Sequence, residues 1–333
     1  MKVLIVDDDL ISLRKLEWLV KSLGHETITA QNGEEAWQIW KDQGPRMLIT
    51  DWIMPKVSGP SLCEKIRNSE GRQYTYIIIV TTKRNTHDLI EAINAGADNF
   101  ISKPYSKEEL SAKITSGQRI VDLESRDMII FAISKLAESR DVETGNHLER
   151  IRYYSKILAQ HLHKKQKYDG QVDHSFIDNI FLTSPLHDIG KIGIPDHILL
   201  KPDRLDDEEF AIMKTHTIIG HETLIATANK DLKADYLKMS ASIALSHHEK
   251  YDGSGYPHGL KGEEIPLPAR IVALADVYDA LVSKRVYKTS YPHDISKSII
   301  LKGNKTHFDP TIVEAFLACE DQFIEVSNLY KDH

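Results

Sequence analysis

Short apolar runs alternate with amphipathic segments over the first 120 residues of the chain. The runs KVLIV, RMLIT, YIIIV and NFISK are brief and mostly apolar, as in strands that are buried on both faces of a sheet. Segments 12–23 and 34–42 between them carry apolar residues at helical spacing. This alternation predicts a doubly wound parallel sheet, in which ligands bind at the carboxyl ends of the strands.

The pattern becomes continuously helical at about residue 106. Residues 106–140 hold no proline and a single glycine, so we expect a stiff helical connector, which could also be the seam of a homodimer. Strand patterns then almost vanish, and helices are predicted over 147–163, 175–189, 207–228, 235–248, 268–284 and 310–325. The predicted fold class is therefore two domains, an α/β sheet followed by an all-helical bundle.

Composition and charge fit a two-domain globular protein. The chain has 333 residues, of which 41% are hydrophobic and 27% charged. Its net charge of −7 argues against a DNA-binding protein, which usually carries a basic excess. The two cysteines are far apart, which argues against a disulfide framework, and no apolar run is long enough to span a membrane. We therefore expect a cytoplasmic protein with no DNA partner and no membrane insertion.

Charged side chains stand at the ends of the predicted strands in the first domain. Asp7 and Asp8 follow the first strand, and Asp51, Thr81 and Lys103 stand at the ends of later ones. Because these ends share one rim of a parallel sheet, their carboxylates would repel one another unless a hard cation such as Mg²⁺ bound there. Asp51 could then accept a phosphoryl group, with Thr81 and Lys103 contacting the added oxygens.

The second domain carries histidines and acids on several helices. In SPLHDIGKIGIP, a helix would place His187 and Lys191 on one face, beside Asp188. Further candidate ligands, histidines and acids, stand elsewhere in the second domain: Glu143, His147, His216, His247, His248 and Asp276. Such side chains, distributed over the helices of one bundle, can build a multinuclear site in its core. Mixed nitrogen and oxygen ligands favour Fe, Mn, Zn, Co or Ni over Mg²⁺ or Ca²⁺.

These groups suit the hydrolysis of a phosphodiester. Two or three metals close together can activate water and clamp a phosphate oxygen, and Lys191 beside them could stabilise charge on the phosphate or help the leaving oxygen depart. In HHEKYDGSGYP, glycines and Pro257 indicate a tight loop that could bring Tyr256 to the substrate. Arg285 and Lys288 offer two cations for a second phosphate.

Residues 1–120 resemble the receiver domain of two-component response regulators. The acidic pair Asp7 and Asp8, Asp51 followed by WIMPKVSG, Thr81, and Lys103 followed by proline carry the resemblance. It implies a flavodoxin-like sheet of five parallel strands, bound Mg²⁺, phosphorylation of Asp51 and a sensor histidine kinase as partner.

Residues 125–325 resemble the HD-GYP family, a group of HD phosphohydrolases that degrade cyclic di-GMP. The motifs RDVETGNHLERI, LHDIGKIGIP, HHEKYDGSGYP, RIVALADVYDAL and FDP stand in the family's order. The resemblance assigns metal binding to Glu143, His147, His187, Asp188, His216, His247, His248 and Asp276. It assigns catalysis to Lys191 together with His187 and Asp188. It assigns substrate binding to Tyr256, Gly255, Pro257, Arg285 and Lys288. Asp279 is assigned either to the same group or to a supporting position next to the ligands.

The same resemblance implies two or three transition-metal ions. Members that lack a glutamate at the position of Glu143 are thought to hold two metals, so its presence points to three. Iron or manganese is favoured, with nickel, cobalt and zinc as alternatives.

The sequence therefore predicts a response regulator with a receiver domain at 1–120, a helical linker at 121–140 and an HD-GYP domain at 141–333. Its predicted activity is hydrolysis of cyclic di-GMP to pGpG, GMP or both, controlled by phosphorylation of Asp51. Two alternatives stay open. The substrate could be another cyclic dinucleotide such as 3′,3′-cyclic GMP-AMP, or the chain could be a catalytically silent receptor for the nucleotide.

Overall fold

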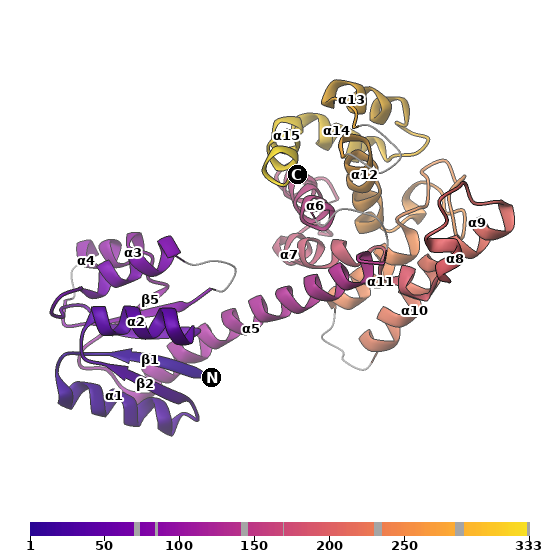
Figure 1. The fold of residues 1–333 in the computed structure, drawn as a ribbon. Coiled ribbons are helices and arrows are strands. Elements are labelled where there is room, and N and C mark those ends of the chain that lie inside the picture. Colours follow the sequence, from indigo (N-terminus) through magenta and orange to yellow (C-terminus); the bar gives the residue numbers. More distant parts are fainter. Residues whose placement is uncertain are drawn as a thin grey trace. The chain divides into compact units, whose positions relative to one another are not determined.

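The computed structural model describes residues 1–69, 74–83, 86–140, 146–168, 170–229, 235–283 and 290–331. Three predicted site residues, Glu143, Arg285 and Lys288, lie outside these ranges. The chain divides into two compact units, Met1–Asp127 and Met128–His333 (Figure 1). Helix α5 (Lys107–Glu138) begins in the first unit and ends in the second, so the predicted boundary at residue 120 falls within this helix.

The first unit is a five-stranded parallel sheet with helices on both faces. The strand order is β2-β1-β3-β4-β5, and every pair is parallel. The strands are β1 (Lys2–Val6), β2 (Glu26–Ala30), β3 (Met47–Asp51), β4 (Tyr76–Thr81) and β5 (Asn99–Ser102). One face packs on α1 (Leu10–Ser22) and α5, and the other on α2 (Gly33–Gln43), α3 (Gly59–Ser69) and α4 (Thr86–Asn94). The predicted doubly wound sheet is confirmed.

Strand β1 shows why the apolar runs fold in this way. Val3 and Ile5 pack with α1 and α5, whereas Leu4 and Val6 point to the opposite face and pack with α2 and α3. A strand that is buried on both faces must be apolar at every position, because successive side chains alternate between the faces. Strand β2 has the mixed sequence ETITA and is only half buried, so its pattern is weaker than that of the four apolar runs.

Helix α5 is continuous, as the sequence predicts. Leu110, Ile114 and Val121 pack into the core of the first unit. Ile130, later on the same helix, packs with Leu182 and other buried residues of the second unit. One helix therefore supplies core residues to both units.

Every named secondary-structure element in the described part of the second unit is a helix or a helical turn, which confirms the predicted fold class. The longer helices are α6 (His147–Lys164), α7 (His174–Thr183), α9 (Asp207–Lys214), α10 (His216–Ala228), α11 (Asp235–Ser246), α12 (Leu267–Val282), α13 (His293–Lys302), α14 (Pro310–Ala318) and α15 (Glu320–Leu329). Short helical turns are η1 (Ser184–Leu186), η2 (Ile189–Gly193), α8 (Asp196–Leu199) and η3 (Gly262–Glu264).

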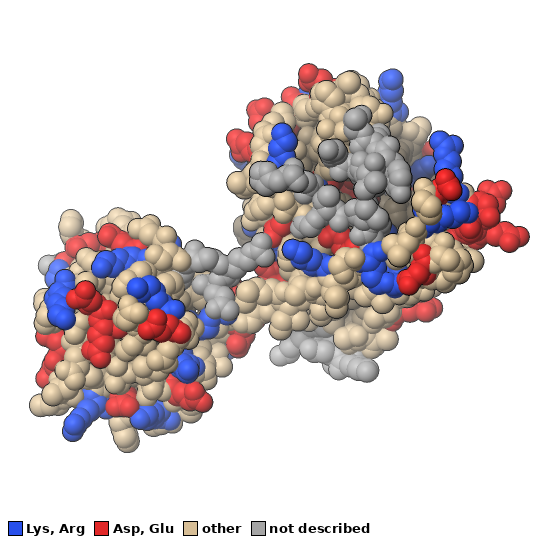
Figure 2. Space-filling model, viewed as in Figure 1, with Lys and Arg blue, Asp and Glu red and all other residues tan. Residues whose placement is uncertain are grey.

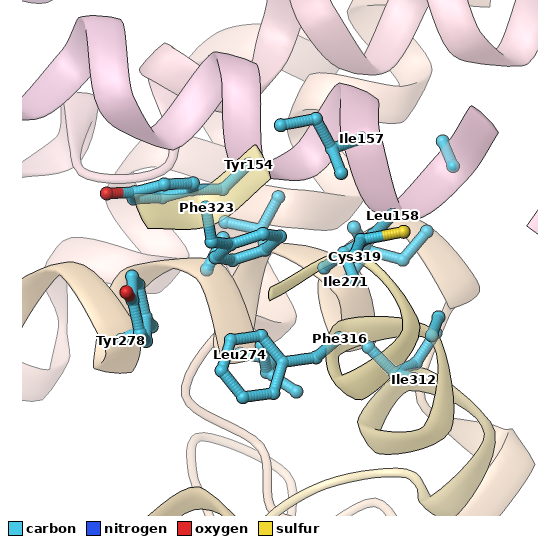
Figure 3. Packing of buried hydrophobic residues seen from close by; sticks show 14 of the residues in the cluster. Tyr154, Ile157, Leu158, Ile271, Leu274, Tyr278, Ile312, Phe316, Cys319 and Phe323 are labelled. Atoms are coloured by element: carbon cyan, nitrogen blue, oxygen red, sulfur yellow. The ribbon is translucent and has the colours of Figure 1, made fainter. Parts of the chain in front are cut away.

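The core of the second unit joins α6, α12, α14 and α15 (Figure 3). Tyr154 of α6 stacks on Phe323 of α15 with ring centroids 4.5 Å apart, and Tyr278 of α12 meets both rings edge-on. Offset and edge-to-face aromatic pairs add to the free energy gained by burying apolar surface. This packing fixes α6 and α12, the helices that carry His147 and Asp276.

Three predicted helices are interrupted in the structure, and those predictions are wrong in this respect. The predicted helix 175–189 ends at Thr183 and continues as 3₁₀ turns, because Pro185 lies in η1 and two glycines lie in η2. The predicted helix 207–228 breaks at Thr215, whose hydroxyl donates to the carbonyl oxygen of Ile212. The predicted helix 310–325 breaks at Cys319, whose backbone is not helical.

Gly190 shows why the turn η2 needs a small residue. A Cβ atom added there would lie 1.9 Å from the carbonyl oxygen of His216. Glycine therefore lets η2 approach the start of α10 closely. This approach brings the region of Asp188 next to His216.

The surface of both units mixes charges of both signs in the view of Figure 2. Among the described residues, no helix is both long and apolar enough to cross a membrane. The expected lack of a DNA partner stays a prediction.

Candidate functional site

The carboxyl ends of β1, β3 and β5 bring an acidic pair and a lysine together in the first unit. The Nζ atom of Lys103 lies 2.5 Å from Oδ1 of Asp51 and 2.8 Å from Oδ2 of Asp7. Burial raises the pKa of Asp7, although Lys103 acts against this effect. Burial also opposes the charge on Lys103, but its hydrogen bonds to Asp51 and Asp7 outweigh burial and raise its pKa. Lys103 therefore stays protonated and offsets part of the negative charge of the two acids.

The other predicted receiver residues lie nearby. Asp8 is exposed in the loop after β1, and the buried Thr81 accepts a hydrogen bond from the backbone N–H of Lys83. Asp7, Asp8 and Asp51 are not among the described groups of three or more ligands whose atoms lie within 4.8 Å of one another. The Mg²⁺ site and the phosphorylation of Asp51 stay predictions.

Seven of the eight predicted metal ligands converge in the second unit. Within each of two groups, one ligand atom of every residue lies within 4.8 Å of the others. The groups are Asp188, His216, His247 and His248, and His147, His187 and Asp276. We call these seven residues the metal centre. The eighth predicted ligand, Glu143, lies outside the described residues.

Asp188 links the two groups. Its Oδ1 atom lies 3.2 Å from Nε2 of His216 and 3.5 Å from Nε2 of His247. Its Oδ2 atom lies 3.4 Å from Nε2 of His187 in the other group. The carboxylate therefore lies between the two groups and could serve cations held by either of them.

In four imidazoles of the metal centre, the Nδ1 atom contacts an oxygen of the protein. Nδ1 of His187 contacts the carbonyl oxygen of Ser184 at 3.0 Å, and Nδ1 of His216 contacts that of Met213 at 2.7 Å. Nδ1 of His247 contacts two carbonyl oxygens in the last turn of α11, and Nδ1 of His147 contacts a carboxylate. Since a carbonyl oxygen can only accept, Nδ1 carries the proton and Nε2 keeps its lone pair for a metal.

The Nε2 atoms on the other side of these rings have the character of metal ligands. Within the described ranges, the buried Nε2 atoms of His187, His216 and His247 make no hydrogen bond, and neither does Oδ1 of Asp188. Buried polar atoms without such bonds are costly unless an ion or water satisfies them. The residues present therefore fit a group of cations.

The protonation of the centre also suits cations. Burial lowers the pKa of His247, and burial together with neighbouring imidazoles lowers that of His248 well below its usual value. Burial acts in the same direction on His187, but the adjacent Asp188 outweighs it and raises that pKa. Burial disfavours charge on Asp188 too, yet Lys191 and His187 hold its pKa well below the usual range. At neutral pH His247 and His248 are thus neutral and Asp188 is ionised.

Asp279 contacts a residue of the metal centre, His147, at the Nδ1 atom of its ring. It is buried, its Oδ2 atom lies 2.7 Å from Nδ1 of His147, and its Oδ1 atom lies 2.5 Å from Nε of Arg150. Burial raises its pKa, but the bonds from His147 and Arg150 prevail and lower it. With both oxygens engaged in this way, Asp279 is placed to orient His147. Its predicted role in substrate binding stays a prediction.

Lys191 reaches the centre by a different route from the one predicted. The predicted helical face that joins His187 and Lys191 is absent, because this segment forms η1 and η2. Lys191 lies in η2, and its Nζ atom lies 2.9 Å from Oδ2 of Asp188. His187 and Lys191 therefore meet the same carboxylate oxygen.

The tight loop predicted in HHEKYDGSGYP contains Gly255, Tyr256 and Pro257, and we call it the GYP loop. It lies against the first group of ligands. The ring of Tyr256 lies 4.7 Å from the imidazole of His248, and its backbone N–H donates to the carbonyl oxygen of the same residue. A Cβ atom at Gly255 would lie 2.3 Å from the backbone nitrogen of Lys250, so the loop requires glycine there. Pro257 follows Tyr256 through a cis peptide bond. Tyr256 is thus close enough to the metal centre to contact a ligand there.

Two supporting residues were missed by the sequence prediction. Glu249 is buried and accepts hydrogen bonds from the backbone N–H groups of His258 and Leu260, which fixes the GYP loop. Arg150 is buried and pairs with Asp279. Position gives a signal for both, since Glu249 directly follows two histidine ligands and Arg150 lies one turn after His147.

Both units match known protein families. Residues 3–115 match the model of the response regulator receiver domain, and residues 132–312 match that of the HD domain. The chain is 37% identical over 99% of its length to a probable cyclic di-GMP phosphodiesterase of Vibrio cholerae, 80% of which is covered. It is 36% identical over its whole length to a cyclic di-GMP phosphodiesterase of Thermotoga maritima, with 94% of that protein covered.

A more partial similarity concerns another substrate. The chain is 40% identical over 62% of its length to a 3′3′-cGAMP-specific phosphodiesterase of Vibrio cholerae, of which 37% is covered.

A receiver domain followed by an HD domain with a convergent set of histidines and aspartates defines a response regulator with a phosphodiesterase output. The chain belongs to this family, in which the HD domain is of the HD-GYP type. The sequence-based assignment to the family is confirmed.

Proposed function

We propose that the protein hydrolyses cyclic di-GMP, to pGpG, GMP or both, under control of phosphorylation at Asp51 by a sensor histidine kinase. The observation that carries this proposal is the convergence of seven histidines and aspartates on one centre, with Lys191 against the bridging Asp188. The names of the relatives in Vibrio cholerae and Thermotoga maritima support cyclic di-GMP as the substrate.

The chemistry follows from the residues of the centre. When bound, two or more transition-metal ions would supply Lewis acidity and activate a water molecule for attack on phosphorus. The new bond would join water oxygen to phosphorus and the bond from phosphorus to the 3′ oxygen would break. The proton that the water loses balances the proton that the 3′ oxygen takes up. Lys191 is a cation at the edge of the centre and is placed to donate this proton or stabilise the leaving oxygen.

Helix α5 offers a route by which the receiver could control this chemistry. Ser134, Ala137 and Glu138 near its end line the same small cavity as His187 and Lys191. A shift of the end of α5 would therefore change the wall of the metal centre directly.

Arg140, two residues after α5, adds a second link. Its guanidinium donates to the carbonyl oxygens of Ile192 and Ile194 and pairs with Asp196. These partners follow Lys191 in the chain, so a movement of α5 would be transmitted to the segment that carries Lys191.

Anaerobic purification with metal analysis, followed by identification of the products from cyclic di-GMP, tests the proposed function. We expect two or three equivalents of transition metal, iron or manganese first, and pGpG or GMP as product. A protein that takes up no transition metal, or that holds metal and leaves cyclic di-GMP intact, would contradict the proposal.

A second candidate is hydrolysis of 3′,3′-cyclic GMP-AMP. The partial similarity to a 3′3′-cGAMP-specific phosphodiesterase favours it. Hydrolysis rates of both cyclic dinucleotides by the same preparation decide between the two. Tight binding of either nucleotide without hydrolysis would instead indicate the silent receptor.

A further inference from the structure

An aromatic surface lies beside the metal centre and takes no part in the chemistry above. Phe210 of α9 is 45% exposed, and its ring centroid lies 6.1 Å from that of Tyr256. The ring of Tyr256 lies 4.7 Å from the imidazole of His248, a residue of the metal centre. A row of three rings therefore leads from a predicted metal ligand to an exposed phenyl ring.

Helix α9 holds this ring in a defined place. It begins with a capping box, in which Asp206 and Glu209 each accept a hydrogen bond from the backbone of the other. Met213, near its end, packs on the buried cluster of Ile194, Ile198 and Leu199. A short helix that is anchored at both ends presents Phe210 without a large loss of conformational entropy when a ligand binds.

A cation accompanies the exposed ring. The Nζ atom of Lys214, one helical turn after Phe210, lies 5.2 Å from the ring centroid. The pair combines a flat apolar surface with positive charge at the same place. A guanine base matches both features, because its face stacks on aromatic rings and its O6 and N7 atoms accept hydrogen bonds from lysine. Adenine presents an amino donor in place of O6.

We propose that Phe210 and Lys214 form a purine subsite that holds one guanine base of the substrate while the adjoining phosphodiester lies at the metal centre. The proposal rests on the proposed function, because it takes the substrate to be a cyclic dinucleotide. Phe210 is separated from the predicted metal ligand His248 by one ring, that of Tyr256. Phe210 and Lys214 thus determine specificity and do not act on the reacting atoms.

The first test separates binding of the substrate from its chemistry. Phe210→Ala should raise KM for cyclic di-GMP about tenfold, equivalent to ~1.4 kcal/mol of lost stacking. It should leave kcat for cyclic di-GMP unchanged, and Phe210→Tyr should restore the low KM. Ile212→Ala, an exposed apolar position on the same helix, is the matched control and should change neither constant.

Lys214 should affect the choice of base. Lys214→Ala should reduce the preference for cyclic di-GMP over cyclic di-AMP several-fold, because only guanine has an O6 acceptor whose contact is lost. An undiminished preference would overturn the role of Lys214.

A binding measurement separates this inference from the proposed function. The four tryptophans of the chain are Trp18, Trp37, Trp40 and Trp52, so Phe210→Trp adds one at the subsite. A phosphorothioate analogue of cyclic di-GMP should quench the added emission relative to the wild type, whereas Ile212→Trp should show no change. If the wild type hydrolyses no cyclic dinucleotide, the proposed function fails, and quenching still judges the subsite. Unaltered emission in Phe210→Trp, or an unchanged KM in Phe210→Ala, would overturn it.

Discussion

The acidic site around Asp51 and the metal centre around Asp188 treat buried negative charge in different ways. At the first site the protein supplies the counter-charge itself, since Lys103 contacts both Asp51 and Asp7 within 2.8 Å. At the second site Lys191 faces only one side of Asp188, and the other side faces imidazole nitrogens without hydrogen bonds to described residues.

This difference separates a site whose charge can change by phosphorylation from a site in which imidazoles surround a carboxylate. Lys103 offsets part of the charge at the first site, and a phosphoryl group on Asp51 would add negative charge for the predicted Mg²⁺ to offset. At the second site, cations would satisfy the buried carboxylate and the imidazole nitrogens around it. The four predictions below test this contrast, from the largest expected effect to the smallest.

Removal of the bridging carboxylate should have the largest effect. Asp188→Ala should lower turnover by more than about 100-fold, because even the partners of metal ligands are typically worth 10- to 100-fold. Bound transition metal, measured by elemental analysis, should fall with it. Asp51→Asn is the matched change at the other site and should leave the metal content unaltered. Asp188→Ala protein that keeps its metal and its activity would remove the contrast.

Asp279→Asn should destabilise the second unit and weaken its metal binding. Loss of the carboxylate would leave Arg150 buried without its charge partner, which typically costs about 3 to 5 kcal/mol of unfolding free energy. It should also weaken metal binding about 10- to 100-fold, because His147 would lose its orienting acceptor. Denaturant unfolding and metal titration measure the two effects.

The buried pair of Asp309 and Arg270 provides the control for this prediction. It lies 2.5 Å apart in the same unit and contacts no residue of the metal centre among the described residues. Asp309→Asn should therefore destabilise the unit by a similar amount and leave metal affinity unchanged. Equal metal affinity in both variants would show that Asp279 has no special role.

Arg140→Ala should weaken the connection between the two sites. Turnover of cyclic di-GMP is compared with and without beryllofluoride, which mimics the phosphoryl group on Asp51. Loss of the contacts to Ile192 and Ile194 should reduce the difference by about 0.5 to 2 kcal/mol, the usual range for such couplings. Asp51→Asn should abolish the difference altogether. A full response in Arg140→Ala would exclude this arginine from the route.

Acid pH should have the smallest effect, with opposite signs in the two units. Burial raises the pKa of Asp7, so its contribution to stability is present below the unfolded pKa and is lost as pH rises through the folded pKa. The pKa of Asp279 is lowered, so its contribution is present above the unfolded pKa of about 4 and is lost as pH falls below it. Acidification should therefore favour the Asp7 site and weaken the Asp279 site.

Spectroscopy can follow the two units separately. All four tryptophans lie in the first unit, so their emission reports its unfolding, whereas far-ultraviolet circular dichroism is dominated by the helical second unit. Asp7→Asn and Asp279→Asn should each change the acid dependence of their own unit in the direction set by the lost acid. The same acid response in each variant as in the wild type would refute the prediction.

The sequence predicted the elements whose burial is uniform and missed those that depend on tertiary contacts. The apolar runs at β1 and β3 are buried on both faces, so composition alone identified them. The turns that carry His187 and Lys191 were predicted as a helix, because their apolar residues recur at similar spacing in either conformation. Pro185 and the glycines of η2 permit the turns, and the close approach of Gly190 to His216 requires a glycine there; that contact joins segments far apart in the sequence.

The same reasoning applies to the site. Histidines and acids could be found by residue type, and the structure brings seven of them together. Residue type alone could not decide whether Asp279 supports a ligand or contacts substrate, because it lies three residues after Asp276 on α12 and both are aspartates. Its contact with Arg150 distinguishes it, and no pattern within a single helix contains that information.

The way the imidazoles are oriented bears on the evolutionary freedom of the site. His187, His216 and His247 are held through main-chain oxygens, which every type of amino acid supplies. Substitutions at Ser184, Met213 and Ile243 therefore keep the carbonyl oxygens that orient those rings. Among these four rings, His147 is the one that contacts a side chain, that of Asp279. Natural variation should therefore be most restricted at Asp279.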